Sequence, residues 1–232
     1  MTLCKHTVKH GFQFHWQIPS FFGLIHLTFV DRTSKIVRKV KEEKLGSRAD
    51  VLPMKKAVAM AFFLAGKGKI KHAALVAVCA GFGLRIGDAL SLRWSTVFTE
   101  GGKIKERVTL TERKTKQSRT LKVLPWVRKI LVEYYEAARP SDHESPLFDF
   151  SRQRAWAIIR KTASDMGLQG KISPHSLRKA FCDFVYENTR DPVLTARITG
   201  HTNPAQLLRY IGRLPEVEER VWDRMAKQLQ RS

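Results

Sequence analysis

The sequence predicts a mainly α-helical fold with one small antiparallel β-sheet, an α+β arrangement. Apolar residues recur at helical spacing along most of the chain after residue 51, whereas residues 96–124 show short strand-like runs joined by turns. The chain has 232 residues, of which 43% are hydrophobic, enough for one large domain with its own core. We therefore expect a domain over residues 51–232, preceded by a basic, poorly patterned extension over residues 1–50.

Helices account for most of the predicted domain. The expected helices cover residues 55–64, 71–82, 86–94, 125–135, 152–166, 176–187, 192–199, 204–210 and 216–230. Gly81 and Gly83 end the second helix, and Pro125 begins the fourth, as these residue types favour. The last helix carries Val217, Val221 and Met225 four residues apart, which gives it an apolar stripe.

Three short strands are expected between the third and fourth helices. They cover residues 97–98, 104–110 and 120–124. The Glu-Gly-Gly run at 100–102 predicts the first turn, and the polar residues 113–118 predict the second. Strands this short, joined by turns, indicate a single antiparallel sheet.

The charge of the chain is its most unusual property. Lys and Arg number 42 against 21 Asp and Glu, a net charge of +21. Such a charge repels itself unless a polyanion neutralises it, so nucleic acid is the first candidate partner and an anionic membrane surface the second. Residues 32–48 are strongly basic, and we expect Arg38, Lys39 and Lys41 to contact DNA phosphates.

Other classes of protein are disfavoured. The longest apolar runs are too short to span a bilayer and no signal peptide is recognisable, so we expect no membrane association. The 3 cysteines form no CxxC pair, which favours a reducing, cytoplasmic location. Residues 66–69, Gly-Lys-Gly-Lys, lack the spacing of a phosphate loop, and no metal-ligand motif is present. We therefore predict neither a metal nor a cofactor.

Polar side chains in separate segments fit one kind of chemistry. They are Arg85, Lys114, His175, Arg178, His201 and Tyr210. Arginine and histidine donors can neutralise the charge on phosphate oxygens, a phenol can attack phosphorus as a covalent nucleophile, and an amine can protonate the leaving oxygen. Asp88, three residues after Arg85, can orient that arginine by pairing with it. Each residue alone is more often a packing or surface residue, so the interpretation depends on the whole set.

Four sequence blocks resemble the tyrosine recombinases, the phage-integrase and Xer/Cre family, over residues 51–232. GLRIGDALSLRW resembles the block with the first catalytic arginine, here Arg85, with Asp88 where an acidic residue is usual. TERKTKQSRTLKVLP resembles the hairpin with the catalytic lysine, which is Lys114 by its Lys-Thr pair or the nearby Lys116. PHSLRKAF resembles the HxxR block, and ITGHTNPAQLLRYIG resembles the closing block with its histidine and tyrosine.

The resemblance implies a site-specific recombinase or integrase. Tyr210 would attack a DNA phosphate to give a 3′-phosphotyrosyl bond, with neither metal nor ATP, and Lys114 would protonate the leaving oxygen. The other catalytic side chains would hold the phosphate or assist proton movement; these are Arg85, His175, Arg178 and His201. Further DNA contacts are expected from Lys116, Arg119 and Lys179.

The same resemblance implies the partners. They are double-stranded DNA and further copies of the chain, since four protomers act on two duplexes. The tail helix over 216–230 is expected to pack onto a neighbouring protomer. The resemblance also implies accessory DNA-bending proteins as candidate partners and association of the chain with the nucleoid.

Two alternative functions stay open. A type IB topoisomerase shares the chemistry, although the second histidine and the short span from the HxxR block to the tyrosine favour a recombinase. Family members usually carry a helical core-binding domain ahead of the catalytic domain, and residues 1–50 lack its pattern. The chain is then either a compact member or a truncated one, and a non-catalytic DNA-binding regulator is the second alternative.

Overall fold

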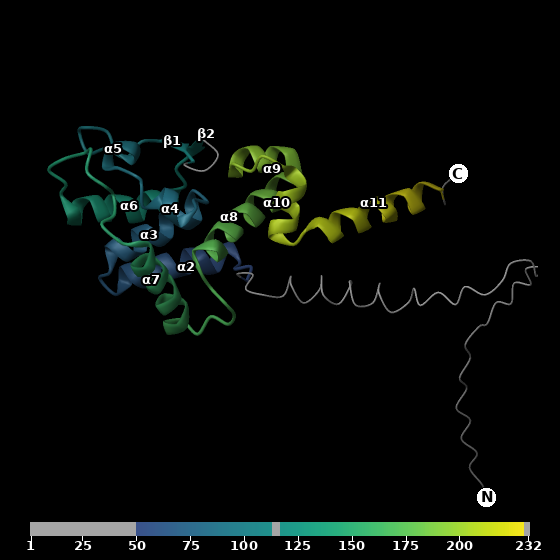
Figure 1. The fold of residues 1–232 in the computed structure, drawn as a ribbon, viewed down its shortest axis with the longest axis horizontal. Helices are drawn as coiled ribbons and strands as arrows, with labels where there is room; N and C mark the ends of the chain where they lie inside the picture. Colours follow the sequence, from purple (N-terminus) through teal and green to yellow (C-terminus); the bar gives the residue numbers. More distant parts are fainter. Residues whose placement is uncertain (1–49, 113–116, 230–232) are drawn as a thin grey trace, which may run out of the picture. The chain divides into compact units, whose positions relative to one another are not determined.

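The protein is described here by a computed structural model that covers residues 50–112 and 117–229. These residues belong to one unit, 48–232, and form a body of helices with one two-stranded antiparallel sheet at its edge (Figure 1). The predicted α+β class is confirmed. The predicted extension lies outside the described residues apart from Asp50, so the division of the chain at residue 50 stays a prediction.

The helices and strands follow one another along the chain in a simple order. They are α2 (Met54–Gly66), α3 (Ile70–Gly81), α4 (Ile86–Ala89), α5 (Trp94–Val97), β1 (Arg107–Thr111), β2 (Ser118–Lys122), α6 (Pro125–Ala138), α7 (Arg152–Asp165), α8 (Pro174–Thr189), α9 (Pro192–Thr199), α10 (Pro204–Ile211) and α11 (Leu214–Leu229). Most helices match the predicted ranges to within a few residues.

Helix α3 forms the centre of the core. All of its residues from Ala73 to Gly81 are buried, because the sequence AALVAVCAG is apolar on every face. It packs against α2, α6, α7 and α8. A Cβ on Gly81 would lie 2.3 Å from the Val127 side chain, so the close approach of α3 and α6 needs glycine there.

The predicted helix over 86–94 is wrong. The structure has two short helices instead, α4 and α5, because the residues between them pair with a distant segment. The amide of Leu147 donates to Leu92 O (2.7 Å), and Arg93 forms an isolated bridge with Pro146. Tertiary pairing outweighs helix propensity at this point.

The sheet contains only two of the three predicted strands. Phe98 makes an isolated bridge with Ile104, so no strand forms at 97–98. In the hairpin, Leu110 of β1 stands opposite Arg119 of β2. Burial alternates along both strands, and Glu112 shares the inward face of β1 with Leu110. The hairpin therefore directs Glu112 and Arg119 into the body of the protein.

The carboxyl-terminal helices pack around a second, smaller core. Its buried residues are Cys182, Tyr186, Ala196, Leu207, Leu208 and Ile211, from α8, α9 and α10. Arg213 fixes the exit from α10: its guanidinium bonds to Asp183, Glu187 and Glu216 at 2.8 Å each. This cluster holds α10 and the start of α11 against α8.

The described helices also bear on the predictions about membranes and cysteines. Among the described residues, no helix has both the length and the hydropathy needed to cross a membrane. Cys79 and Cys182 are free thiols in the core.

Candidate active site

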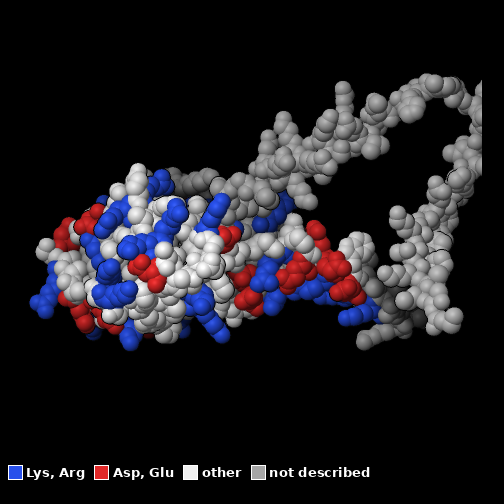
Figure 2. Space-filling model, turned by 90° about the horizontal axis from the view of Figure 1, so that it is seen from below, with Lys and Arg blue, Asp and Glu red and all other residues white. Residues whose placement is uncertain are grey.

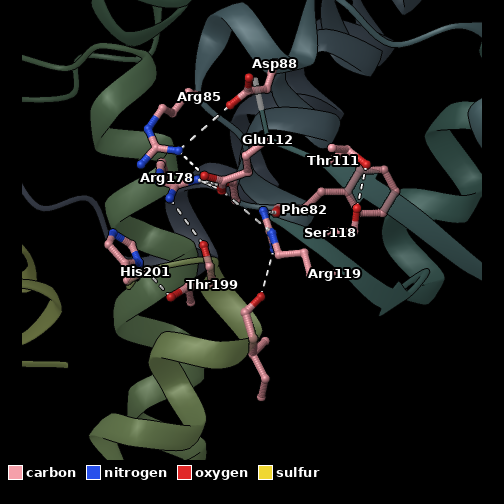
Figure 3. Close-up of polar contacts among 12 residues, drawn as sticks. Phe82, Arg85, Asp88, Thr111, Glu112, Ser118, Arg119, Arg178, Thr199 and His201 are labelled. Carbon is pink, nitrogen blue, oxygen red and sulfur yellow. Dashed lines mark hydrogen bonds and ion pairs between the residues drawn. The ribbon is translucent and has the colours of Figure 1, made fainter. Parts of the chain in front are cut away.

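Arg178 is the buried centre of the candidate site. It lies in the first turns of α8 with 2% of its surface exposed. Its Nη1 donates to Gly83 O (2.6 Å) and to Glu112 Oε1 (3.1 Å), and its Nη2 donates to Thr199 O (3.2 Å). One guanidinium thus joins α8 to the segment before α4, to the hairpin and to the end of α9 (Figure 3).

Arg85 reaches the same place from the segment between α3 and α4. Gly83 turns the chain there at φ +60°, and a Cβ on it would lie 2.2 Å from the Phe181 ring. Arg85 Nη1 donates to Glu112 Oε2 and lies 4.0 Å from Asp88 Oδ2. The predicted pairing with Asp88 is therefore a longer ion pair, and the hydrogen bond goes to Glu112. The Arg85 side chain is 30% exposed, so it is partly open to solvent.

Glu112 is a member of the site that the sequence analysis missed. It is fully buried and accepts hydrogen bonds from both Arg85 and Arg178. Burial of the carboxyl opposes its ionisation, but the neighbouring Arg178 and Arg85 outweigh burial and lower the pKa of Glu112. The signal was available: Val108, Leu110 and Glu112 fall on one face of a strand, and a charge on an inward face needs a buried partner.

Arg119 was expected to contact DNA, which stays a prediction, and the structure places most of its side chain inside the protein. It is 8% exposed, and it donates to Ile198 O (2.8 Å) and Phe82 O (2.7 Å). Its Nε also lies 3.9 Å from Glu112 Oε1. The physical reason is strand parity, because Arg119 shares the inward face of β2 with Leu121. Arg119 holds the hairpin against α3 and α9.

His201 follows α9 beside the buried arginines. Gly200 ends α9 in the left-handed conformation at φ +73°, and this turn brings His201 back toward Thr199. Nδ1 of His201 shares a hydrogen bond of 2.8 Å with the Thr199 hydroxyl. Burial, together with Arg178 and Arg85, lowers the pKa of His201 to about 4, so the ring is neutral at pH 7.

Tyr210 lies on α10, next to His201. The two rings have centroids 5.5 Å apart, and the Tyr210 hydroxyl donates to the backbone carbonyl of His175 (3.2 Å). Burial raises the pKa of the Tyr210 phenol.

Lys179, expected as a DNA contact, is 9% exposed, and its Nζ lies 5.5 Å from the centre of the Tyr210 ring. His175 is exposed at the start of α8. The protein atoms that surround part of its ring, together with the nearby Arg178, lower the pKa of the imidazole.

These side chains form one connected set on the described part of the chain. Arginine donors, neutral imidazoles and a phenol that meet in one place can bind an anion and attack it. Within the described residues, 50–112 and 117–229, no group of three or more His, Cys, Asp or Glu is arranged to hold a metal ion. Five predicted residues lie outside the described ranges, and their roles stay predictions; these are Arg38, Lys39, Lys41, Lys114 and Lys116.

Comparison with known proteins identifies the class to which this arrangement belongs. A model of the phage integrase family matches residues 51–216, well over half of the chain. The chain belongs to the phage integrase family. The resemblance found in the four sequence blocks is thereby confirmed at the level of the family.

Individual relatives agree with this membership. Probable integrase/recombinase YoeC of Bacillus subtilis is 32% identical over 136 residues, which cover 56% of this chain and 70% of YoeC. Tyrosine recombinase XerD of Corynebacterium glutamicum is 30% identical over 146 residues, covering 58% of this chain and 45% of XerD. This integrase-family chain spans about half the length of the XerD relatives that it matches.

Solved structures share the fold. The XerA recombinase matches with a TM-score of 0.58 at 20% identity, covering 78% of this chain and 67% of XerA. The XerH recombinase bound to its palindromic difH substrate matches with a TM-score of 0.59 at 19% identity, covering 77% of this chain and 54% of XerH. The fold of the integrase-family domain is therefore that of these recombinases.

The surface of the integrase-family domain is rich in cations. On the face seen in Figure 2, Lys and Arg side chains are spread over most of the body, and acidic side chains gather in smaller groups. A surface of this kind attracts a polyanion such as DNA through its phosphates.

Proposed function

We propose that this chain breaks and rejoins DNA as a site-specific recombinase, with Tyr210 as the nucleophile. The observation that carries the proposal is the linkage of the arginines to the tyrosine. Glu112 joins Arg85 to Arg178, Arg178 reaches Thr199 O, and the Thr199 hydroxyl holds His201 beside Tyr210. Such a set is what transfer of a phosphoryl group to a phenol requires.

In the proposed first step, the phenolic oxygen of Tyr210 attacks the phosphorus of a phosphodiester in DNA. A bond from phosphorus to the tyrosine oxygen forms as the bond to the 5′ oxygen breaks. The products are a 3′-phosphotyrosyl ester and a free 5′-hydroxyl. The ester is close in energy to the phosphodiester it replaces, so the 5′-hydroxyl of another strand can reverse the step without ATP. Arg85, Arg178 and His201 neutralise the charge that grows on the non-bridging oxygens.

Two protons have to move in this step. The Tyr210 phenol enters it protonated, because burial raises its pKa. It loses that proton as the bond to phosphorus forms, and a neutral His175 is the proposed acceptor. The leaving 5′ oxygen gains a proton, for which Lys114, or Lys116 beside it, is the proposed donor.

The activity is tested with nicked duplexes that release a short fragment when cut, so that rejoining cannot occur. A library of such duplexes, drawn from the DNA on either side of the gene, supplies candidate sites. We expect a protein–DNA adduct that survives a denaturing gel and forms with EDTA present and ATP absent. Binding to DNA with no adduct on any member of the library would favour the non-catalytic regulator instead.

Helix α11 is the proposed contact between protomers on DNA. Val221, Trp222 and Met225 on it are 50%, 65% and 46% exposed, and large apolar side chains exposed together mark interaction surfaces. A lambda integrase related in fold has been solved as a dimer bound to a core site. We propose that α11 packs onto a neighbouring copy, and that four copies assemble on two duplexes.

This assembly is tested by changing the apolar residues of α11. We expect Trp222→Asp to reduce the size of the complexes on DNA, because it places a charge in the proposed contact. Analytical ultracentrifugation of the DNA complexes measures the size, and Lys227→Ala, a change of another exposed residue of α11, is the control. Complexes of unchanged size with the Trp222 variant would rule out α11 as the contact.

A further inference from the structure

Glu112 has a position that the proposed chemistry does not explain by itself, and the inference drawn from it rests on the proposed function. We propose that Glu112 is a positioning residue: its carboxylate holds Arg85 and Arg178 at the spacing at which both can bind one phosphate. The carboxylate is fully buried, and each of its oxygens faces a different arginine. Glu112 directly follows β1, while the arginines come from α8 and the segment before α4.

The need for such a residue follows from electrostatics. Two guanidinium groups that converge on one phosphate repel each other before DNA arrives, and the low dielectric of a protein interior strengthens that repulsion. Arg178 has little freedom to move away, since Gly83 O and Thr199 O fix it from two other sides. Arg85 forms a 4.0 Å ion pair with Asp88 and a direct hydrogen bond with Glu112, so Glu112 is the closer constraint on where its guanidinium lies.

The contacts also decide which donors are left for a substrate. Glu112 and Gly83 O together occupy Nη1 of Arg178, Thr199 O takes one donor of its Nη2, and Glu112 binds Nη1 of Arg85. An arginine has five N–H donors, so both guanidiniums keep donors that these bonds do not use. The Arg85 side chain is 30% exposed, so a phosphate can approach it from solvent.

The charge of the cluster fits the same role. Arg85, Arg119 and Arg178 are three cations around Glu112, and Asp88 adds a second carboxylate beside Arg85, which leaves a surplus of one positive charge. Glu112 therefore reduces the repulsion without cancelling the field that attracts a phosphate. The carboxylate stays ionised under neutral conditions, since the two arginines lower its pKa.

Gly200 gives an independent indication that the space for this carboxylate is reserved. A Cβ on Gly200 would lie 2.6 Å from Glu112 Oε1 and 3.2 Å from Arg119 Nε. The residue before His201 thus has to be small for Glu112 to occupy its place, in addition to the positive φ of that position. The position of the histidine and that of the carboxylate are linked through this contact.

The same contacts also allow the opposite role for Glu112, inhibition of the site, and the test has to distinguish the two. A carboxylate on both arginines could instead occlude the phosphate site, and its neutralisation would then speed up cleavage. Glu112→Gln keeps the size and removes the charge, whereas Glu112→Asp keeps the charge on a side chain one methylene shorter. Glu100→Gln makes the same change of charge in an exposed turn and is the matched control.

The variants are compared by single-turnover cleavage at saturating DNA, using the duplex on which the wild-type chain forms its adduct. We expect Glu112→Gln to cleave about 100-fold more slowly, as a misplacement of about 1 Å does, with a Kd for DNA within about threefold of the wild-type value. Glu112→Asp should recover part of this loss, and Glu100→Gln should match the wild type. Cleavage by Glu112→Gln at or above the wild-type rate overturns the proposal, and so does a loss no smaller in the Asp variant.

A second measurement does not depend on cleavage. NMR of the arginine Nε–Hε groups in the DNA-free protein reports whether the Arg85 and Arg178 guanidiniums are held in one arrangement. We expect sharp, separate signals in the wild type and Glu112→Asp, and a broadened Arg85 signal in Glu112→Gln. If Glu112→Gln does not fold, the test is cleavage by Glu112→Asp, which we expect to be slower than the wild type, but by less than the roughly 100-fold loss of a 1 Å misplacement. An unchanged Arg85 signal in Glu112→Gln, or wild-type cleavage by Glu112→Asp in that case, would overturn the proposal. Absence of an adduct from the wild type would count against the proposed function alone.

Discussion

Tyr210→Phe is expected to abolish the covalent protein–DNA adduct while DNA binding persists. Phenylalanine has no oxygen to attack phosphorus, so no partial activity can remain at this position. The substitution removes a single hydrogen bond to His175 O, which costs about 1 kcal/mol of folding free energy and leaves the fold intact. A denaturing gel after incubation with the nicked duplexes measures the adduct, and a mobility shift at the same salt concentration measures binding.

A matched control comes from a tyrosine elsewhere in the fold. Tyr135 bonds through its hydroxyl to His143 Nε2 at 2.9 Å, at the end of α6, and belongs to no part of the candidate site. Tyr135→Phe should form the adduct at the wild-type level. An adduct formed by Tyr210→Phe would mean that another residue attacks the phosphate, and the assignment of the nucleophile would be wrong.

The fold was predictable where one segment decides its own structure. The apolar run of α3 and the capped, amphipathic pattern of the later helices fix those elements locally. The segment at 86–98 was mispredicted, because Leu92 and Arg93 adopt their conformation to pair with residues 146–147, more than 50 positions away. Local periodicity carries no information about such a partner.

The candidate site divides in the same way. Arg85, His175, Arg178, His201 and Tyr210 come together in the structure, as their sequence blocks indicated. Glu112 was missed, and Arg119, predicted as a DNA contact, is largely buried in the structure. Strand parity places both residues on the inward face, where Glu112 forms ion pairs with Arg178 and with Arg119 that offset the cost of burial. Polarity alone was therefore a poor guide to exposure in this hairpin.

Arg178→Met is expected to damage both the stability and the activity of the protein. Methionine fills a similar volume but donates no hydrogen bond, so Gly83 O and Thr199 O lose a donor and Glu112 loses a buried cationic partner. Removing one member of a buried ion pair costs about 3–5 kcal/mol of folding free energy. Urea denaturation measures this loss, and Arg197→Met on the exposed side of α9 should change the folding free energy by less than about 0.5 kcal/mol.

The loss of activity should exceed what unfolding explains. Removing one preorganised donor to the transition state lowers the rate by about 10²- to 10³-fold, so cleavage should fall at least this far at temperatures where the variant is folded. The double variant Arg178→Met with Glu112→Gln separates the two effects. In the double variant the side chain at position 112 is neutral and needs no cationic partner. The losses of folding free energy in the two single variants should therefore add up to about 1–3 kcal/mol more than the loss in the double variant. Strictly additive losses would mean that Glu112 and Arg178 do not act on each other, and the buried cluster could not be the structural basis of the site.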